Sequence, residues 1–286
     1  MPNRTEYQLE ETMPRFFDYL NLWVQGQPAQ VAYVFNDHYT NYANFWNEAQ
    51  HFAKYLLKIG VKKGDRLAFI MTPRPELLTF YLASTMVGAV MVAMNINFKT
   101  TEMAYVLNHS GSSHILTIHG YDDVKYQDYL KEALKQVSNV GQVWVAGGPA
   151  ELPNATTFEE IMHGDYSEYN KALQNRINEI EADDGLIIVY TAQPTGQPEG
   201  TVLTHRDVIA HGLNTKDEWL APAGIQPGDH ILIAGPMNHA GSAAELYAAP
   251  MIAGSTQYLM EKYDPMVTPK LIEKYRIDLM PGQPVM

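Results

Sequence analysis

Apolar and polar residues alternate along this chain in two kinds of block, short continuous apolar runs and longer stretches with apolar positions three and four residues apart. The stretch 42–59 is of the second kind. Tyr42, Phe45 and Phe52 recur at that spacing, and Gly60 stands just past the end. The pattern predicts an amphipathic helix whose aromatic stripe packs into the core.

The same two patterns extend over most of the sequence. Short apolar runs predict strands at 66–71, 89–93, 114–118, 142–146, 230–234, 255–259 and 277–280. Helices are predicted after Pro75 and at 101–108, 124–137, 206–220, 242–253 and 265–275. One more helix is predicted to end near Glu181. Because strands and helices alternate, the predicted fold class is α/β, with doubly wound, mainly parallel sheets flanked by helices.

The weakly patterned region 147–184 is polar and punctuated by Pro and Gly. We place a boundary there, between a first α/β subdomain at 1–183 and a second at 184–286. A different question arises at 77–98, which carries no charged residue and is long enough for a membrane span. Gly88 divides it, however, and a buried helix followed by a buried strand is the preferred interpretation.

Composition narrows the class of protein. The chain has 286 residues and a formal charge of −12, without a run of Lys or Arg, so neither nucleic acid nor an anionic membrane is expected as a partner. It has no cysteine, which excludes disulfides and thiolate sites. The first 16 residues lack the apolar stretch of a signal peptide, so a cytoplasmic location is expected.

One segment, 186–206, carries the strongest chemical signal. An apolar strand leads into a loop of Thr, Gly and Pro, and a second strand ends at a polar helix start. Threonine hydroxyls and glycines that let main-chain N–H groups approach an anion are what a polyphosphate-binding turn requires. The residues concerned are Thr191, Thr195, Thr201, Gly196 and Gly200. The alternative is a hairpin without chemical meaning.

This segment resembles the signature loop of the adenylate-forming superfamily, which includes acyl-CoA synthetases, luciferases and peptide-synthetase adenylation domains. The family usually reads Tyr-Thr-Ser-Gly-Thr-Thr-Gly-x-Pro-Lys-Gly, followed by Thr-His. Further ordered similarities lie at Gly64–Ala68, Gly88–Asn95, Pro236–Ser242 and Tyr263–Pro265. The resemblance implies two stacked, doubly wound sheets, as in the N-terminal domain of these enzymes, here incomplete.

The loop also departs from the family pattern. Ala192 and Gln193 replace Ser and Gly, Pro194 replaces Thr and removes an N–H donor, and Glu199 replaces Lys. An anion in place of a cation costs about 1 kcal/mol per charge pair at 4 Å in water, and about 4 at an intermediate dielectric. We therefore expect this loop to bind phosphate more weakly than the usual family loop does. The resemblance assigns cofactor binding to Thr191, Ala192, Gln193, Pro194, Thr195, Gly196, Glu199 and Gly200.

The resemblance also places an acyl site. His239 corresponds to a catalytic position beside the carboxylate, where a neutral imidazole polarises or orients an oxygen. The implied substrate pocket comprises Met237, His239, Gly241 and Ser242. A capping or core histidine is the alternative for His239. Thr204 and the histidine after it are explained by a helix cap. Trp219, Met237 and Tyr247 are candidates for lining an apolar pocket, and ordinary core packing is the preferred interpretation for each.

Other chemistries lack their patterns. The Walker lysine is missing after Gly196, Ser242 is not in Gly-x-Ser-x-Gly, and His205 and His211 are six residues apart, not four. No metal site belonging to the chain itself is predicted. Mg²⁺ is expected to arrive with the nucleotide.

The leading hypothesis is therefore the N-terminal portion of an AMP-forming acyl-CoA synthetase. The implied cofactors are ATP and Mg²⁺, with CoA as co-substrate and a small carboxylic or fatty acid as substrate. The family's adenine and ribose segments, hinge and C-terminal lid domain do not occur before Met286, so we expect this chain alone to be inactive. Two alternatives to this function stay open. The protein is a non-catalytic acyl-binding or assembly protein, or it belongs to a subfamily whose complete enzyme is active with this unusual loop. Whether the partner is a second copy of the chain or a separate C-terminal half also stays open.

Overall fold

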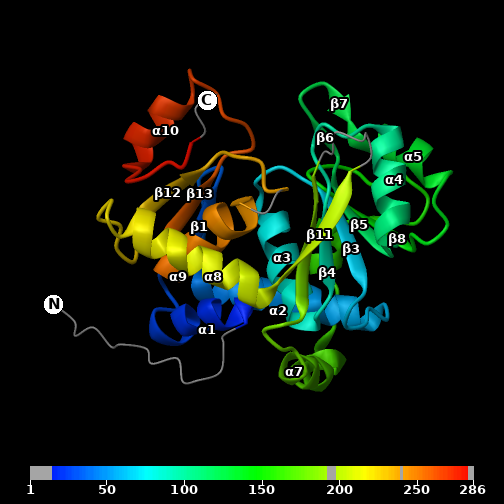
Figure 1. The fold of residues 1–286 in the computed structure, drawn as a ribbon, viewed down its shortest axis with the longest axis horizontal. Coiled ribbons are helices and arrows are strands. Elements are labelled where there is room, and N and C mark those ends of the chain that lie inside the picture. Colours follow the sequence, from blue (N-terminus) through cyan, green and yellow to red (C-terminus); the bar gives the residue numbers. More distant parts are fainter. Residues whose placement is uncertain (1–14, 192–197, 239–240, 283–286) are drawn as a thin grey trace.

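The structure is a computed structural model that describes residues 15–191, 198–238 and 241–282 (Figure 1). Its helices are α1 (Phe16–Gly26), α2 (Tyr42–Lys58), α3 (Pro75–Val87), α4 (Thr100–Ser110), α5 (Tyr126–Leu134), α6 (Phe158–Met162), α7 (Asn170–Asn178), α8 (His205–Thr215), α9 (Ala249–Ala253) and α10 (Thr268–Tyr275). Its strands are β1 (Val31–Phe35), β2 (His38–Asn41), β3 (Arg66–Ile70), β4 (Val90–Ala93), β5 (His114–Ile118), β6 (Gly120–Tyr121), β7 (Val124–Lys125), β8 (Gln142–Ala146), β9 (Ala155–Thr157), β10 (Gly185–Thr191), β11 (Glu199–Thr204), β12 (His230–Ile233) and β13 (Thr256–Leu259).

Two sheets organise the molecule. The larger has the order β11-β10-β4-β3-β5-β8-β9 and is parallel except for the antiparallel edge strand β11. The smaller has the order β12-β13-β1-β2 and is parallel except for β2. Helix α3 lies between the sheets (Figure 1), and every residue from Leu77 to Val87 is buried. The predicted α/β class with stacked, mainly parallel sheets is confirmed.

Each of the two sheets contains strands from both sides of the predicted boundary at residue 184. Strands β10 and β11, which follow that position, complete the larger sheet, and β1 and β2 from the start of the chain complete the smaller one. Neither sheet is therefore built from one side of the boundary alone. The division into subdomains at 1–183 and 184–286 stays a prediction.

The uncharged stretch 77–98 forms most of α3 followed by β4, as preferred from the sequence. Gly88 ends the helix in the left-handed conformation, with φ of 70°, which a residue with a side chain adopts less readily. In the part of the chain that the structure describes, no helix is both long and apolar enough to cross a membrane.

Several local predictions need correction. Helix α1 and the hairpin β1–β2 were not predicted, and 277–280 contributes only a bridge between Leu279 and Ile231. The helix expected at 242–253 begins as a π-helix over Ser242–Ala248 before α9. Trp219, expected in the core, is 67% exposed because it lies on the outer side of a second π-helical turn, Lys216–Leu220.

Candidate functional site

The loop singled out in the sequence is flanked by two paired strands. Thr191 at the end of β10 pairs with Glu199 at the start of β11, and Tyr190 pairs with Gly200. Residues 192–197, which include Ala192 through Gly196, lie outside the described part. The pairing confirms that the segment turns back on itself. Because β10 is parallel to β4, the turn is at the carboxyl edge of the larger sheet, where open α/β sheets bind ligands.

Helix α4 contacts both ends of this turn. The Tyr105 hydroxyl donates to the carbonyl of Pro198 at 3.0 Å, just after the loop. His109 Nδ1 and the Tyr190 hydroxyl are 2.9 Å apart, just before it. The two side chains on α4 stack with ring centroids 5.4 Å apart. These contacts were missed in the sequence, although the four-residue spacing of Tyr105 and His109 places them on one helical face.

Gly200 has a packing role in addition to the one predicted. A Cβ at this position would stand 3.0 Å from Cζ of Tyr190 and 3.1 Å from a methyl of Ile188. The tyrosine ring thus lies over the glycine across the strand pair, and a side chain at this position would crowd it. Whether the Gly200 amide also contacts an anion stays a prediction.

Charge at the turn is set by Glu199. Its side chain is exposed, and among the residues that the structure describes it forms no ion pair. Thr191 is also exposed, so its hydroxyl is available to a ligand. The two strand ends that flank the loop therefore offer one hydroxyl, from Thr191, and one carboxylate, from Glu199. The carboxylate repels a phosphate.

The predicted acyl segment follows β12 in the smaller sheet. Met237 is buried in the main core, and the buried Ser242 donates its hydroxyl to the carbonyl of Pro236 at 2.5 Å. Gly241 is half-buried. The predicted catalytic residue, His239, lies outside the described residues. Tyr247 is fully buried and donates to the Leu78 carbonyl, which confirms it as core.

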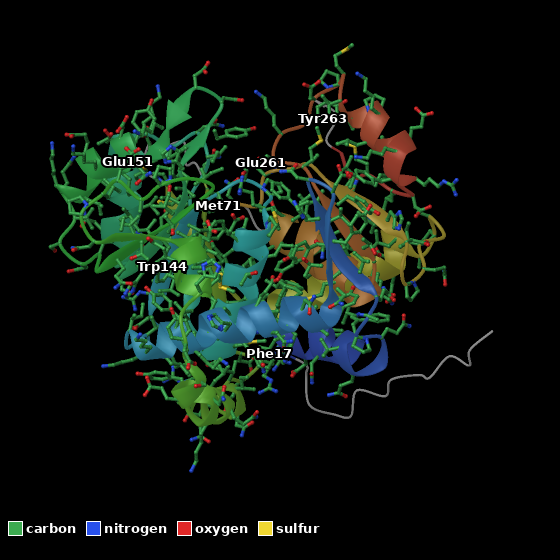
Figure 2. All side chains as sticks on the ribbon, turned by 180° about the vertical axis from the view of Figure 1, so that it is seen from behind. Phe17, Met71, Trp144, Glu151, Glu261 and Tyr263 are labelled. Carbon is green, nitrogen blue, oxygen red and sulfur yellow. The ribbon has the colours of Figure 1, made fainter. Side chains whose placement is uncertain are left out.

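The carboxyl edges of the two sheets face the same side of the molecule. Thr72 and Arg74, which follow β3, both bond to one carboxylate oxygen of Glu261, which follows β13, at 2.9 and 3.1 Å. Figure 2 labels Met71, which precedes Thr72, and Glu261 in the middle of the molecule, where the two sheets meet. Burial opposes the charge of Arg74, but Glu76 and Glu261 outweigh it and raise its pKa. The two candidate segments thus belong to one edge of the fold.

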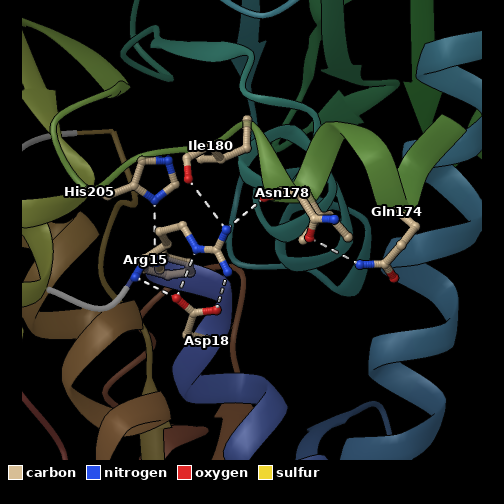
Figure 3. Close-up of polar contacts among 8 residues, drawn as sticks. Arg15, Asp18, Gln174, Asn178, Ile180 and His205 are labelled. Atoms are coloured by element: carbon tan, nitrogen blue, oxygen red, sulfur yellow. Dashed lines mark hydrogen bonds and ion pairs between the residues drawn. The ribbon is translucent and has the colours of Figure 1, made fainter. Parts of the chain in front are cut away.

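The Thr-His pair after the loop begins α8. The side chain of Thr204 accepts from the Asp207 amide and caps the helix, as predicted. His205 is fully buried, and its Nδ1 accepts the backbone N–H of Phe16 at 3.1 Å (Figure 3). Burial lowers the pKa of His205 to about 4. This histidine anchors α1, a role that its sequence position did not reveal.

Within the described residues, no group of three or more His, Asp or Glu side chains is placed to hold a metal ion.

A family comparison agrees with this geometry. The family model described as AMP-binding enzyme matches residues 20–286. The chain belongs to that family. The resemblance noted in the sequence is thereby confirmed.

Curated relatives are acyl-CoA synthetases and CoA ligases. The chain is 26% identical over 275 residues to the putative acyl-CoA synthetase YngI of Bacillus subtilis, covering 91% of this chain and 49% of the relative. It is 23% identical over 267 residues to the medium-chain fatty-acid–CoA ligase of Escherichia coli, covering 93% and 45%. The chain thus spans about half the length of the curated relatives it matches.

Solved structures share the fold. A putative long-chain fatty-acid CoA ligase from Rhodopseudomonas palustris superposes with a TM-score of 0.78 at 19% identity, over 95% of this chain and 63% of that one. The N-terminal subdomain of Klebsiella oxytoca NpsA, in complex with 3-hydroxyanthranilyl-AMSN, gives 0.69 at 20% identity, over 94% and 60%. At these identities the likeness shows the fold alone.

Proposed function

We propose that the chain is the ATP- and acyl-binding portion of an AMP-forming acyl-CoA synthetase. The observation that carries the proposal is the turn between Thr191 and Glu199. It joins two paired strands at the carboxyl edge, and a second segment with the family pattern, around Met237, follows a strand at the same edge. Family membership supports the same assignment.

The proposed reaction has two steps. A carboxylate oxygen of the acid attacks the α-phosphorus of ATP, and pyrophosphate leaves, giving an acyl-adenylate. The thiol of CoA then attacks the acyl carbon, and AMP leaves with the electron pair of the broken bond. Catalysis of such steps consists mostly of positioning and charge stabilisation.

The described residues fit ATP only in part. The Thr191 hydroxyl is exposed at the turn and suits a phosphate oxygen, while the carboxylate of Glu199 does not. We assign the remaining phosphate contacts to residues 192–196, and the orientation of the acid to His239 with Gly241 and Ser242. Mg²⁺ would enter on the nucleotide, where it neutralises phosphate charge, and CoA would act as the thiol acceptor.

The direct test is titration of this chain with ATP and with fatty and small carboxylic acids. We expect acid binding, weak ATP binding and no pyrophosphate exchange. Glu199→Lys replaces repulsion with attraction and should strengthen ATP binding about tenfold or more, since about 1.4 kcal/mol is a factor of ten. Glu218→Lys, an equal charge change at an exposed position elsewhere, should leave ATP binding unchanged. Robust exchange by residues 1–286 would refute the predicted inactivity.

The exposed Glu199 favours one alternative, a non-catalytic protein that binds carboxylates or assembles with partners through the same fold. The same titrations separate the two proposals. Acid binding without ATP binding, both before and after Glu199→Lys, supports the alternative. ATP binding restored by Glu199→Lys indicates a weakened enzyme.

A further inference from the structure

A groove of about 370 Å³ lies beside β8 and β9, at the end of the larger sheet opposite to β10 and β11. It is between the end of α5 and the turn that precedes β9. Its lining comes from two segments, which we call its walls, and from Val143 of β8. Leu134 and Val137 belong to the first segment, and Leu152 and Pro153 to the second. Such a volume is within the roughly 300–1,000 Å³ of small-molecule sites. The lining is mainly aliphatic, so the groove suits a hydrocarbon chain.

Hydrogen bonds to main-chain carbonyls hold both walls. The carbonyl of Gln136, beside Val137, accepts from the side-chain amide of Asn108 on α4 at 2.9 Å. On the other side, the Asn154 carbonyl accepts from the Val143 amide at 3.2 Å. The groove is therefore formed before any ligand arrives, and binding does not require the walls to be ordered.

The charged residues that line the groove are both lysines, although the chain as a whole carries a charge of −12. Lys131 and Lys135 are four residues apart, so they are neighbours on one helical face. Lys135 pairs with Glu132 at 2.7 Å, but both side chains are more than half exposed, and such pairs contribute little stability. Lys131 pairs with no carboxylate among the described residues. The Lys131 ammonium is thus available to an anion, and an anion has only an exposed ion pair to compete with at Lys135.

The groove is separate from the candidate site. Gly141 and Asn154, which line it, come immediately before β8 and β9, whereas Thr191 is the last residue of β10 and Met237 comes after β12. In a parallel sheet these positions belong to opposite edges. A ligand here would bind without occupying the candidate acyl site.

We propose that this groove binds a medium-chain fatty carboxylate, with its hydrocarbon chain along the aliphatic lining and its carboxylate between Lys131 and Lys135. A compact anion such as phosphate would leave the aliphatic lining unfilled. A neutral hydrocarbon would leave the Lys131 ammonium without a carboxylate partner among the described residues. A fatty carboxylate has a partner for both parts of the groove, its hydrocarbon chain for the aliphatic lining and its carboxylate for the lysines.

The test uses a decanoate analogue with a photoreactive diazirine on its chain, followed by peptide mapping of the labelled protein. We expect label within 131–154, where decanoate competes and decylamine does not. The double variant K131Q/K135Q should lose this label and bind decanoate there about tenfold more weakly. K171Q/K270Q removes two exposed lysines elsewhere and should behave as the unaltered chain.

Label confined to residues outside 131–154, or equal labelling of this region in K131Q/K135Q, would overturn the proposal. So would a self-association that V140E abolishes in sedimentation velocity, without labelling of the groove, because a second copy would then be the occupant. Label near 236–253 reports the candidate acyl site separately. Loss of one labelled region while the other persists therefore distinguishes failure of this inference from failure of the proposed function.

Discussion

The burial of His205 predicts a specific loss of stability in acid. Its Nδ1 accepts the backbone N–H of Phe16, at the first turn of α1, so the ring must be neutral there. Its other nitrogen, Nε2, is buried without a hydrogen-bond partner. Protonation would place a second donor against the Phe16 N–H and a charge in the core, and this explains why burial lowers the pKa to about 4.

The sign and size of the effect follow from linkage. At pH well above 6.5, the histidine is neutral in both the folded and unfolded chains, and its titration does not affect stability. As the pH falls from 6.5 toward about 4, the unfolded chain binds a proton that the folded chain does not. Stability therefore falls with pH, by about 2 kcal/mol between pH 7 and pH 5.

Urea unfolding at pH 7 and pH 5 measures this loss. His205→Asn keeps an acceptor near the Nδ1 position but does not titrate, so its free energy of unfolding should change with pH by about 2 kcal/mol less than that of the unaltered chain. His38→Asn, at an exposed position on β2, controls for removal of a histidine as such. An equal pH dependence in the unaltered chain and His205→Asn, or an NMR titration of His205 near its ordinary pKa, would refute the reasoning.

Three further changes test the packing by urea unfolding and hydrogen exchange. Gly254→Ala puts a methyl group against the indole ring of Trp23 on α1, at φ of 71°, and should lower the free energy of unfolding by about 2–4 kcal/mol. The control Gly224→Ala, at φ of 85° in open space, should lower it by about 1–2 kcal/mol. Arg74→Met leaves two glutamates without their cation and should cost about 2–4 kcal/mol, while Arg206→Met, in an exposed pair, should cost less than about 1. Tyr105→Phe should cost about 1 kcal/mol and speed amide exchange in β11; unchanged exchange would argue against the contact with α4.

The sequence was most informative where the signal is local. Strands β5 and β8 have the predicted bounds, because each is a buried apolar run between turn residues. Helices α2 and α8 begin within one residue of their predicted starts, and side-chain caps at Asn41 and Thr204 explain why. Such features depend only on residues within a few positions of one another.

The missed elements depend on distant partners. Helix α1 begins at Phe16 without a Ser, Thr or Asn cap, and Arg15 instead bonds to the carbonyls of Ile177 and Ile180 (Figure 3). Strand β1 pairs with β13, from the opposite end of the chain. The same limit applies to His205, whose neighbour Phe16 is far away in sequence. No pattern within a short window specifies such contacts.

The candidate site combines both cases. Its two segments were found because each carries a local pattern, but they follow strands of different sheets, so their placement depends on how the sheets pack around α3. The bonds from Thr72 and Arg74 to Glu261 join the two carboxyl edges directly. Arg74→Met should therefore weaken acid binding as well as stability, whereas a variant that lowers stability elsewhere, such as Gly254→Ala, should leave acid binding by the folded fraction unchanged.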